Sequence, residues 1–551
     1  MNTGPQSADD RRPGWLAPTT VRAYPLDYPP TMPALVRRTV TEFGAVEFVV
    51  TADERVTFAA MEERSRRLAA QLVAAGAGKG SRVGMLFAQG PEWIETFLAI
   101  TRIGAVAMAF STFLTPAELR KVLRHGDAQL LVVPPTLFGR SMVDFVEEAQ
   151  AGLGAAASTV GAVLRLPEVP YLRSVIVRRG DGPSWPDAVD DGLVAAMEEH
   201  VTPADWLCTI YTSGTTSEPK GVVHTHGTQI RHGANLAELR GFGRGDGIFA
   251  AMPFFWVGGL TCTLLPALHV GCTLICQERF EAAGALDLIE RERPKALMGW
   301  PNVRQRLVAH PSFPGRDLEG VPFFPPPGAP EIDLQLMHNS LGMTETSGPH
   351  TVAGTDELTR ILPESLRGSF GPRVPYVEHR IADFETNATL PDAQEGEVCI
   401  RGYSVMAGMY KREREDVFDA EGWYHTGDRG YFRDGYLFFT GRATEMIKTA
   451  GNNVAPREVE VALEAFPEIR LALVFGLPDE ERGQVVVAGV APALGATVDV
   501  DDVRERVRKE LSAYKVPRAI VVLADDEIPL LGSGKADRRA IAATIATKLN
   551  R

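Results

Sequence analysis

Apolar residues near the start of the chain follow two spacings, one typical of helices and the other of short buried strands. Positions 59–75 repeat apolar residues at helical spacing, whereas the apolar runs at 82–87 and 105–110 are short enough for strands. A helix is expected over 91–104, between these two runs, and another strand at 129–133. Strands that alternate with helices predict a parallel sheet with helices on both faces.

The helix expected over 115–126 carries a start signal. Thr115 is placed to cap it, Pro116 occupies the first helical position, and Glu118 follows Thr115 by three residues. Thr and Glu at this spacing each accept a hydrogen bond from the other's backbone N–H, which forms a capping box. We therefore predict that the helix starts at Pro116.

The pattern of apolar residues and glycines changes twice in the second half of the chain. A second α/β region is expected over 204–330, after an Ala/Gly-rich surface excursion at 151–200. Short apolar runs between glycine turns over 360–441 predict a small β-barrel-like unit. The rest predicts a compact α+β module with helices over 456–466 and 503–514, strands at 471–476, 485–490 and 519–523, and a closing helix after Lys535.

Composition narrows the function classes. The chain has 551 residues, too many for one core, and a formal net charge of −13. An acidic balance disfavours nucleic acids and anionic membrane surfaces as general partners. The five cysteines are scattered, and Cys272 and Cys276 stand in an apolar strand-like run, so buried thiols are favoured over a zinc site.

Neither a signal peptide nor a membrane span is expected. The N-terminal stretch lacks an apolar core, and the longest apolar region, 260–276, is interrupted by Pro266 and His269. That region is interpreted as a buried helix and strand. We expect a soluble cytoplasmic protein with no integral membrane association.

The residues from Tyr211 to Gly221, YTSGTTSEPKG, have the composition of a phosphate-binding loop. Five serine or threonine side chains, two glycines and Lys220 lie within eleven residues. Hydroxyl and backbone N–H groups donate to phosphate oxygens, and a lysine supplies positive charge. The stretch is not a Walker loop, because Pro219 precedes the lysine and glycine follows it.

Four further motifs follow in order. They are NSLGMTET (339–346), YHTGDRG (424–430), GRATEMIKTAGNNVAPREVE (441–460) and PLLGSGKADRR (529–539). Each alone is compatible with an ordinary surface turn. Together and in this order they resemble the adenylate-forming superfamily of acyl- and aryl-CoA synthetases, peptide-synthetase adenylation domains and luciferases, over about residues 30–545.

The resemblance implies an α/β fold of unequal parts. A large N-terminal domain of α/β sheets with a small β-barrel-like subdomain is followed by a small, mobile C-terminal α+β domain. The expected division is a lead-in at 1–30 without stable structure, an N-terminal domain at 31–441, a hinge at 442–446 and a C-terminal lid at 447–551. Thr444 stands at the hinge position, where the superfamily usually has Asp or Lys.

The resemblance also implies an ATP- and Mg²⁺-dependent ligation of a carboxylic acid to coenzyme A. Acyl-adenylate formation is limited by charge repulsion, so the site has to position and neutralise its reactants. Glu345 matches the Mg²⁺ ligand and Thr344 the α-phosphate contact. Asp428 and Arg442 match the ribose contacts, and the β- and γ-phosphate loop is matched by Thr212, Ser213, Gly214, Thr215, Thr216 and Lys220.

Three positions match residues of the C-terminal domain. Lys535 matches the lysine that bridges the carboxylate, the α-phosphate and the ribose. Lys448 and Gly451 match positions that serve the second step, where glycine lets a pantetheine arm approach the backbone. These positions favour coenzyme A as acceptor; an acyl carrier protein acting in trans is the alternative, and a homodimer is compatible with the sequence.

The adenine and acyl pockets depart from the usual pattern. Leu341 replaces the aromatic residue that commonly stacks on adenine, and the segment before it is short, as if a helix were lost. Adenine is expected between Leu341 and Gly328-Ala329, next to Ser340, Gly342 and Met343. These departures motivate a second alternative, a non-catalytic nucleotide-binding protein.

An apolar acyl pocket is expected from Phe255, Trp256, Val257, Gly258, Trp300 and Val303, with Gly258 and Gly259 leaving room.

Two histidines follow the phosphate loop. His224 and His226 are expected on one face of the strand that leaves the loop, without an evident third ligand. Structural or substrate-edge roles are therefore favoured over a metal pair. The particular acid stays open at this point.

Overall fold

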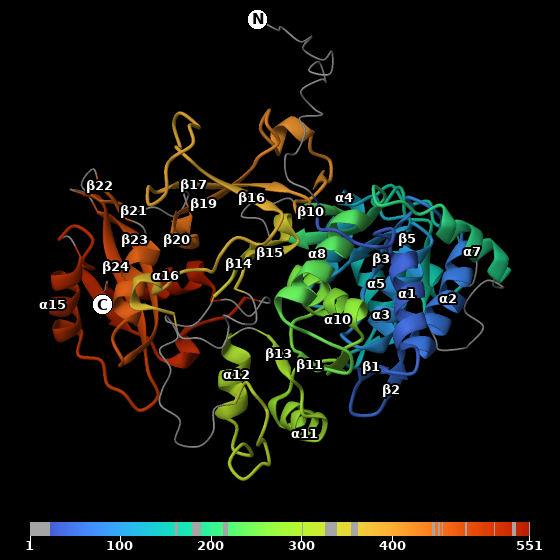
Figure 1. Cartoon of the computed structure of the whole chain (residues 1–551), viewed down its shortest axis with the longest axis horizontal. Helices are drawn as coiled ribbons and strands as arrows, with labels where there is room; N and C mark the ends of the chain where they lie inside the picture. Colours follow the sequence, from blue (N-terminus) through green and yellow to red (C-terminus); the bar gives the residue numbers. More distant parts are fainter. Residues whose placement is uncertain are drawn as a thin grey trace, which may run out of the picture.

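In the computed structural model, two sheets covered by helices form the N-terminal part of the chain, and smaller sheets follow toward its C-terminal end (Figure 1). It describes residues 23–159, 163–178, 189–212, 219–299, 301–324, 339–353, 362–442, 447–449, 452–454, 456–479, 482–511, 513–531 and 536–549.

The larger sheet confirms the parallel arrangement predicted from the alternating pattern. Its order is β18 (Gly408–Met409), β10 (Lys220–Thr225), β9 (Trp206–Thr212), β4 (Val106–Ala109), β3 (Arg82–Met85), β5 (Leu130–Val133) and β8 (Ser174–Val177). The strands from β9 to β8 run parallel, and β10 and β18 are antiparallel to their neighbours. The last strand, β8, lies within the supposed surface excursion at 151–200, so that part of the expectation was wrong.

Strand β5 shows why this sheet reads as continuous apolar runs. Leu130 and Val132 belong to one hydrophobic core, whereas Leu131 and Val133 belong to another. Successive side chains of a strand point to opposite faces, so both faces of the sheet are buried. The covering helices are α2 (Phe58–Ala74), α3 (Pro91–Arg102) and α7 (Asp191–Glu199) for the first core, and α4 (Pro116–His125), α5 (Met142–Ala149) and α6 (Leu153–Ala157) for the second.

The predicted start of α4 is confirmed in detail. Thr115 Oγ1 accepts from the Glu118 N–H at 3.3 Å, and Glu118 Oε2 accepts from the Thr115 N–H at 2.8 Å. Pro116 is the first helical residue. The capping box could be found from the sequence because all its contacts are local.

A second sheet completes the N-terminal core. Its order is β13 (Ala296–Met298), β11 (Gly247–Ala250), β12 (Thr273–Cys276), β1 (Glu47–Val50) and β2 (Arg55–Thr57), with only β2 antiparallel. The other helices are α1 (Met32–Phe43), α8 (His226–Leu239), α9 (Val257–Gly259), α10 (Leu265–Val270), α11 (Ala282–Glu292) and α12 (Pro301–Val308).

The apolar region at 260–276 is a buried helical segment followed by β12, as expected. It begins with a π-helical turn, Leu260–Leu264, which leads directly into α10. Within the described residues, no helix combines the length and apolar character needed to cross a bilayer.

The glycine-rich region beyond residue 360 forms a four-stranded antiparallel sheet. Its order is β16 (Val377–Ala382), β17 (Gly396–Gly402), β19 (Tyr424–Arg433) and β20 (Tyr436–Arg442). A hairpin of β14 (Leu341–Met343) and β15 (Gly348–Thr351) precedes it. Strands β6 (Thr136–Leu137) and β7 (Arg140–Ser141), which follow β5 in the chain, form a separate two-stranded antiparallel ribbon.

The C-terminal elements have their own sheet and core. The strands are β21 (Ile447–Thr449), β22 (Asn452–Val454), β23 (Ile469–Asp479), β24 (Gly483–Pro492) and β25 (Ala519–Val522), packed with α14 (Pro456–Glu464), α15 (Val500–Glu510) and α16 (Arg538–Leu549). Helix α15 ends earlier than the sequence pattern predicted, and Tyr514 is 37% exposed beyond it.

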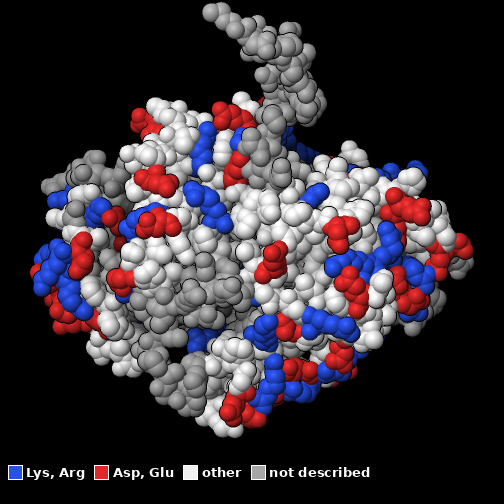
Figure 2. All heavy atoms as spheres, in the orientation of Figure 1, with Lys and Arg blue, Asp and Glu red and all other residues white. Residues whose placement is uncertain are grey.

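Positive and negative side chains are interspersed on the surface. Figure 2 shows red and blue groups mixed across the visible face, without one large basic area. Many of them are paired, such as Arg55 with Glu47 and Glu292.

Candidate functional site

The strands β9 and β10 frame the predicted phosphate-binding loop. Thr212 ends β9 and is paired with Lys220, the first residue of β10. Residues 213–218 lie outside the described part of the chain. The loop therefore starts and ends on two paired strands of the larger sheet, while its own contacts stay predictions, including those of Ser213, Gly214, Thr215 and Thr216.

A short segment around Met406 joins this hairpin to the turn that carries Glu345. Glu345 lies in the 3-10 turn Thr344–Thr346, between β14 and β15. The Met406 N–H donates to the Glu345 carbonyl at 2.8 Å, and the next N–H, of Ala407, donates to the Val223 carbonyl in β10 at 2.9 Å. Two consecutive backbone bonds thus hold the predicted Mg²⁺ residue beside the strand that leaves the phosphate loop.

His224 makes a second link between the same two elements. Its Nδ1 lies 3.1 Å from the hydroxyl of Ser347, and that hydroxyl donates to the Ser404 carbonyl at 2.8 Å. Because the hydroxyl has one proton, it accepts from His224, so Nδ1 carries the hydrogen. Burial lowers the pKa of His224 to about 3, which keeps the ring neutral at pH 7.

Three predicted site residues converge around Tyr424. Burial raises the pKa of the Tyr424 phenol, the nearby Glu345 carboxylate adds to the rise, Arg442 opposes it, and Asp428 adds a further contribution. These groups therefore lie close enough to act on one phenol, although Glu345 and Asp428 are 83 positions apart in the sequence. The structure brings the predicted Mg²⁺ residue and the predicted ribose residues into one site.

Asp428 and Arg442 face each other across β19 and β20. They are register partners, and Arg442 Nε lies 2.9 Å from Asp428 Oδ1. The Asp428 side chain is only 4% exposed, whereas that of Arg442 is 52% exposed. A buried carboxylate held by one arginine is a suitable acceptor for a ribose diol, and the hard oxygens of Glu345 suit Mg²⁺.

The predicted acyl segment forms an aromatic group. The rings of Phe255 and Trp256 are 4.8 Å apart, and Phe113, 55% exposed, stacks on Trp256 at 5.7 Å. A Cβ added at Gly348 would lie 3.9 Å from Val257, so this segment also reaches the hairpin that contains Glu345. Phe255, Trp256 and Val257 therefore lie near the predicted catalytic turn.

The two glycines of this segment do not leave free room. A Cβ at Gly258 would meet the Met252 sulfur at 2.5 Å, and one at Gly259 would meet the Pro253 carbonyl oxygen at 2.1 Å. The space is filled by the preceding backbone and side chain, so the expectation of an open volume here was wrong. Val303 is buried in a different cluster, between α11 and α12.

The two histidines after the loop do not share a strand face. Strand β10 ends at Thr225, whose side chain caps α8, so His226 is already helical. His226 Nδ1 accepts from the Met32 N–H at 3.1 Å, while His224 bonds to Ser347. The shared face expected from a spacing of two was wrong because the chain turns into a helix between them.

The structure describes some of the remaining predicted residues and leaves others out. Leu341, Gly342 and Met343 form β14, and Ser340 precedes it. For Lys448 the structure describes only the backbone, in β21. The predictions at Trp300, Gly328, Ala329, the hinge around Thr444, Gly451 and Lys535 fall outside the described residues.

Sequence reasoning missed residues that support the site. Tyr424 and His425 stand inside the motif that supplies Asp428, so their position in the chain was an available signal. Ser347 and Glu397 had no such signal, because their partners His224 and His425 lie far away in the sequence.

Family comparison agrees with this geometry. Residues 36–410 match the model of the AMP-binding enzyme family, and residues 458–535 match that of the AMP-binding enzyme C-terminal domain. A 4-coumarate–CoA ligase of Humulus lupulus is 31% identical over 514 residues, 90% of each chain. A feruloyl-CoA synthase of an Amycolatopsis species is 30% identical over 487 residues, 87% of this chain and 92% of the relative.

Solved structures agree on the fold. The amide bond synthetase McbA of Marinactinospora thermotolerans superposes with a TM-score of 0.73 at 25% identity, over 93% of this chain and 99% of that one. ATP-bound MatB of Rhodopseudomonas palustris gives 0.71 at 22% identity, over 93% and 98%. The chain therefore belongs to the AMP-binding enzyme family and is an enzyme of the adenylate-forming superfamily, with acyl- and aryl-CoA ligases among its relatives.

Proposed function

We propose that the chain is an ATP- and Mg²⁺-dependent acyl-CoA synthetase for a carboxylic acid with an apolar body. The observation that carries this proposal is the convergence of Glu345, Asp428 and Arg442 around Tyr424. The frame of the phosphate loop is tied to the same turn through Met406 and Ala407. The relatives named as CoA ligases support the acceptor.

In the first step a carboxylate oxygen of the acid attacks the α-phosphorus of ATP, and the bond to the pyrophosphate oxygen breaks. Lys220 and the hydroxyl loop would hold the leaving phosphates, and Glu345 would hold the Mg²⁺ that offsets their charge. Asp428 and Arg442 would orient the ribose. Lys535 would neutralise the charge that moves between carboxylate and phosphate.

In the second step the coenzyme A thiolate attacks the acyl carbon, and AMP leaves with the bridging oxygen. We place the domain division at 31–441, 442–446 and 447–551, with Lys448 and Gly451 serving this step. An acyl carrier protein is the competing acceptor. A cytoplasmic location stays a prediction.

The group of aromatic side chains at the acyl segment supports the proposal that the acid has an apolar body. Phe113, Phe255 and Trp256 pack within 6.0 Å of one another, measured between ring centres. Such a surface binds flat or branched apolar groups and offers little to a second carboxylate.

The test is a panel of straight-chain, branched, alicyclic and aromatic acids. Each is incubated with ATP and Mg²⁺, pyrophosphate is measured, and coenzyme A is then added. We expect pyrophosphate release with at least one apolar acid, followed by a CoA thioester and AMP. Accumulation of acyl-AMP without a thioester would eliminate coenzyme A as acceptor, and no pyrophosphate with any acid would refute the proposal.

A further inference from the structure

The carboxylate predicted to bind ribose is presented by an irregular part of strand β19. Glu397 of β17 pairs with Arg429, and Cys399 pairs with His425, so a step of two residues on β17 corresponds to a step of four on β19. The extra residues lie at 426–428 and include Asp428. Residues in a bulge lose ladder hydrogen bonds, so other groups must satisfy their backbone.

Side chains supply those missing bonds. The Gly427 N–H donates to Glu397 Oε1 at 2.9 Å, and the Asp428 N–H donates to Thr426 Oγ1 at 3.0 Å. Thr426 Oγ1 in turn donates to the Val398 carbonyl at 2.7 Å. Gly427 has φ +71°, a conformation that suits glycine, so the bulge needs both its glycine and its acceptors.

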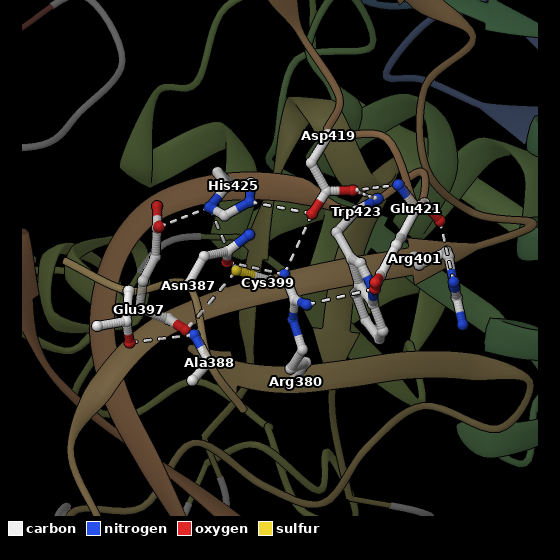
Figure 3. Close-up of polar contacts among 11 residues, drawn as sticks. Arg380, Asn387, Ala388, Glu397, Cys399, Arg401, Asp419, Glu421, Trp423 and His425 are labelled. Atoms are coloured by element: carbon white, nitrogen blue, oxygen red, sulfur yellow. Dashed lines mark hydrogen bonds and ion pairs between the residues drawn. The ribbon is translucent and has the colours of Figure 1, made fainter. Parts of the chain in front are cut away.

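The acceptor Glu397 is itself held by a chain of polar side chains. His425 Nδ1 donates to Glu397 Oε2 at 2.7 Å, and its Nε2 lies 3.4 Å from Asp419 Oδ2. Figure 3 shows the ring between the two carboxylates. Asp419 is anchored by the Trp423 N–H at 2.8 Å and by Arg380 at 3.1 Å.

A metal ion is the competing interpretation of this cluster. Within the described residues, Glu397, Cys399 and His425 are the one group of three potential ligands, with ligand atoms within 4.8 Å of one another. However, Glu397 Oε1 already accepts from Gly427, and the Arg380 guanidinium, ion-paired with Asp419, lies close to the thiol. Burial raises the pKa of Cys399 to about 12, which disfavours the thiolate that a metal prefers.

We propose that Glu397 and His425 are positioning residues, which hold the 426–428 bulge so that Asp428 meets the ribose hydroxyls of ATP. Glu397 acts on the Gly427 N–H, and His425 acts by orienting Glu397. The inference rests on the proposed function only in taking Asp428 as the ribose acceptor. Neither residue touches the nucleotide in this account.

The test compares two nucleotides that differ only in the ribose hydroxyls. Acid-dependent pyrophosphate exchange is measured with ATP and with 2′,3′-dideoxy-ATP for the wild type, Glu397→Leu, which removes both acceptor oxygens, His425→Phe and Asp428→Asn. We expect kcat/KM for ATP to fall about tenfold, mainly through KM, and that for the dideoxy nucleotide to change little. The preference for ATP therefore shrinks in all three variants.

Cys399→Ala is the matched control. It removes a buried side chain 3.5 Å from His425 Nδ1 without breaking the chain from Asp419 to Gly427, so the preference should persist. His425→Gln, whose amide is able to donate to Glu397, should recover part of the preference. An equal loss with both nucleotides, or the same loss in Cys399→Ala, would overturn the proposal in favour of a purely structural role.

Calorimetry with AMP and 2′,3′-dideoxy-AMP separates this proposal from the assigned reaction, because binding needs neither acid nor acceptor. If exchange is absent in the wild type, the proposed function fails, and the binding preference still decides the role of Glu397. Stoichiometric zinc in the purified protein, removed by a chelator together with the ATP preference, would show that the cluster is a metal site and would also overturn the positioning role.

Discussion

Ser347 offers a selective way to perturb the turn that carries Glu345. It directly follows the turn that carries Glu345, it is fully buried, and it has φ +60° although it is not glycine. Its hydroxyl donates to the Ser404 carbonyl and accepts from the His224 Nδ1–H. Removal of the hydroxyl takes a hydrogen-bond partner from one buried acceptor, the Ser404 carbonyl, and from one buried donor, His224.

The expected cost follows from those two groups. An unsatisfied buried donor or acceptor costs about 1–3 kcal/mol, so Ser347→Ala should lose about 3 kcal/mol of unfolding free energy. Ser347→Gly loses the same bonds but relieves about 1–2 kcal/mol of left-handed strain, of which about 0.5–1 kcal/mol is offset by backbone entropy. The glycine variant should therefore be the more stable of the two by roughly 0.5–1 kcal/mol.

Urea unfolding at pH 7 measures the three proteins, and a double-mutant cycle with His224→Phe gives the coupling. We expect a coupling of about 0.5–3 kcal/mol, because the two residues share one hydrogen bond. An unfolding free energy of Ser347→Ala within about 0.5 kcal/mol of the wild type would refute the reasoning. A glycine variant less stable than the alanine variant would refute it too.

Three other predictions concern stability and the two lysines. Burial lowers the pKa of His224 to about 3, so the unfolded chain binds its proton first as pH falls from about 6.5 toward 3. Protonation of this imidazole in the unfolded chain should lower the free energy of unfolding by about 2 kcal/mol between pH 7 and pH 5. An unchanged urea midpoint over that range would contradict this prediction. Thr115→Ala should lose about 1 kcal/mol through its cap, whereas Thr115→Ser should lose little, as measured by thermal melting. Lys535→Ala should abolish acid-dependent pyrophosphate exchange with ATP binding kept, and Lys220→Ala should mainly weaken ATP binding; the reverse pattern would exchange their roles.

The parts of the fold that could be predicted depend on local contacts or simple periodicity. The capping box of α4 was found at Thr115 and Glu118 because its partners are only three positions apart. The parallel sheet was found because both faces of strands such as β5 are buried. Strand β8 was missed because its partner is β5, and nothing in the residues near 174 reports that pairing.

The candidate site was predicted as a set of residues and not as an arrangement. The motifs supplied Glu345, Asp428 and Arg442, and the structure brings them to Tyr424. The links that hold them, such as His224 to Ser347, join positions 123 apart in the sequence. The bulge at 426–428 also escapes the sequence, because it depends on the register with β17.

The most direct test of the central claim follows oxygen from the acid to the nucleotide. A carboxylic acid that supports pyrophosphate release is labelled with ¹⁸O in both carboxylate oxygens and incubated with ATP, Mg²⁺ and coenzyme A. Because the adenylate forms through a carboxylate oxygen and AMP leaves with it, AMP should contain one ¹⁸O by mass spectrometry. Unlabelled AMP, or label in inorganic phosphate with ADP as the nucleotide product, would contradict adenylate formation at this site.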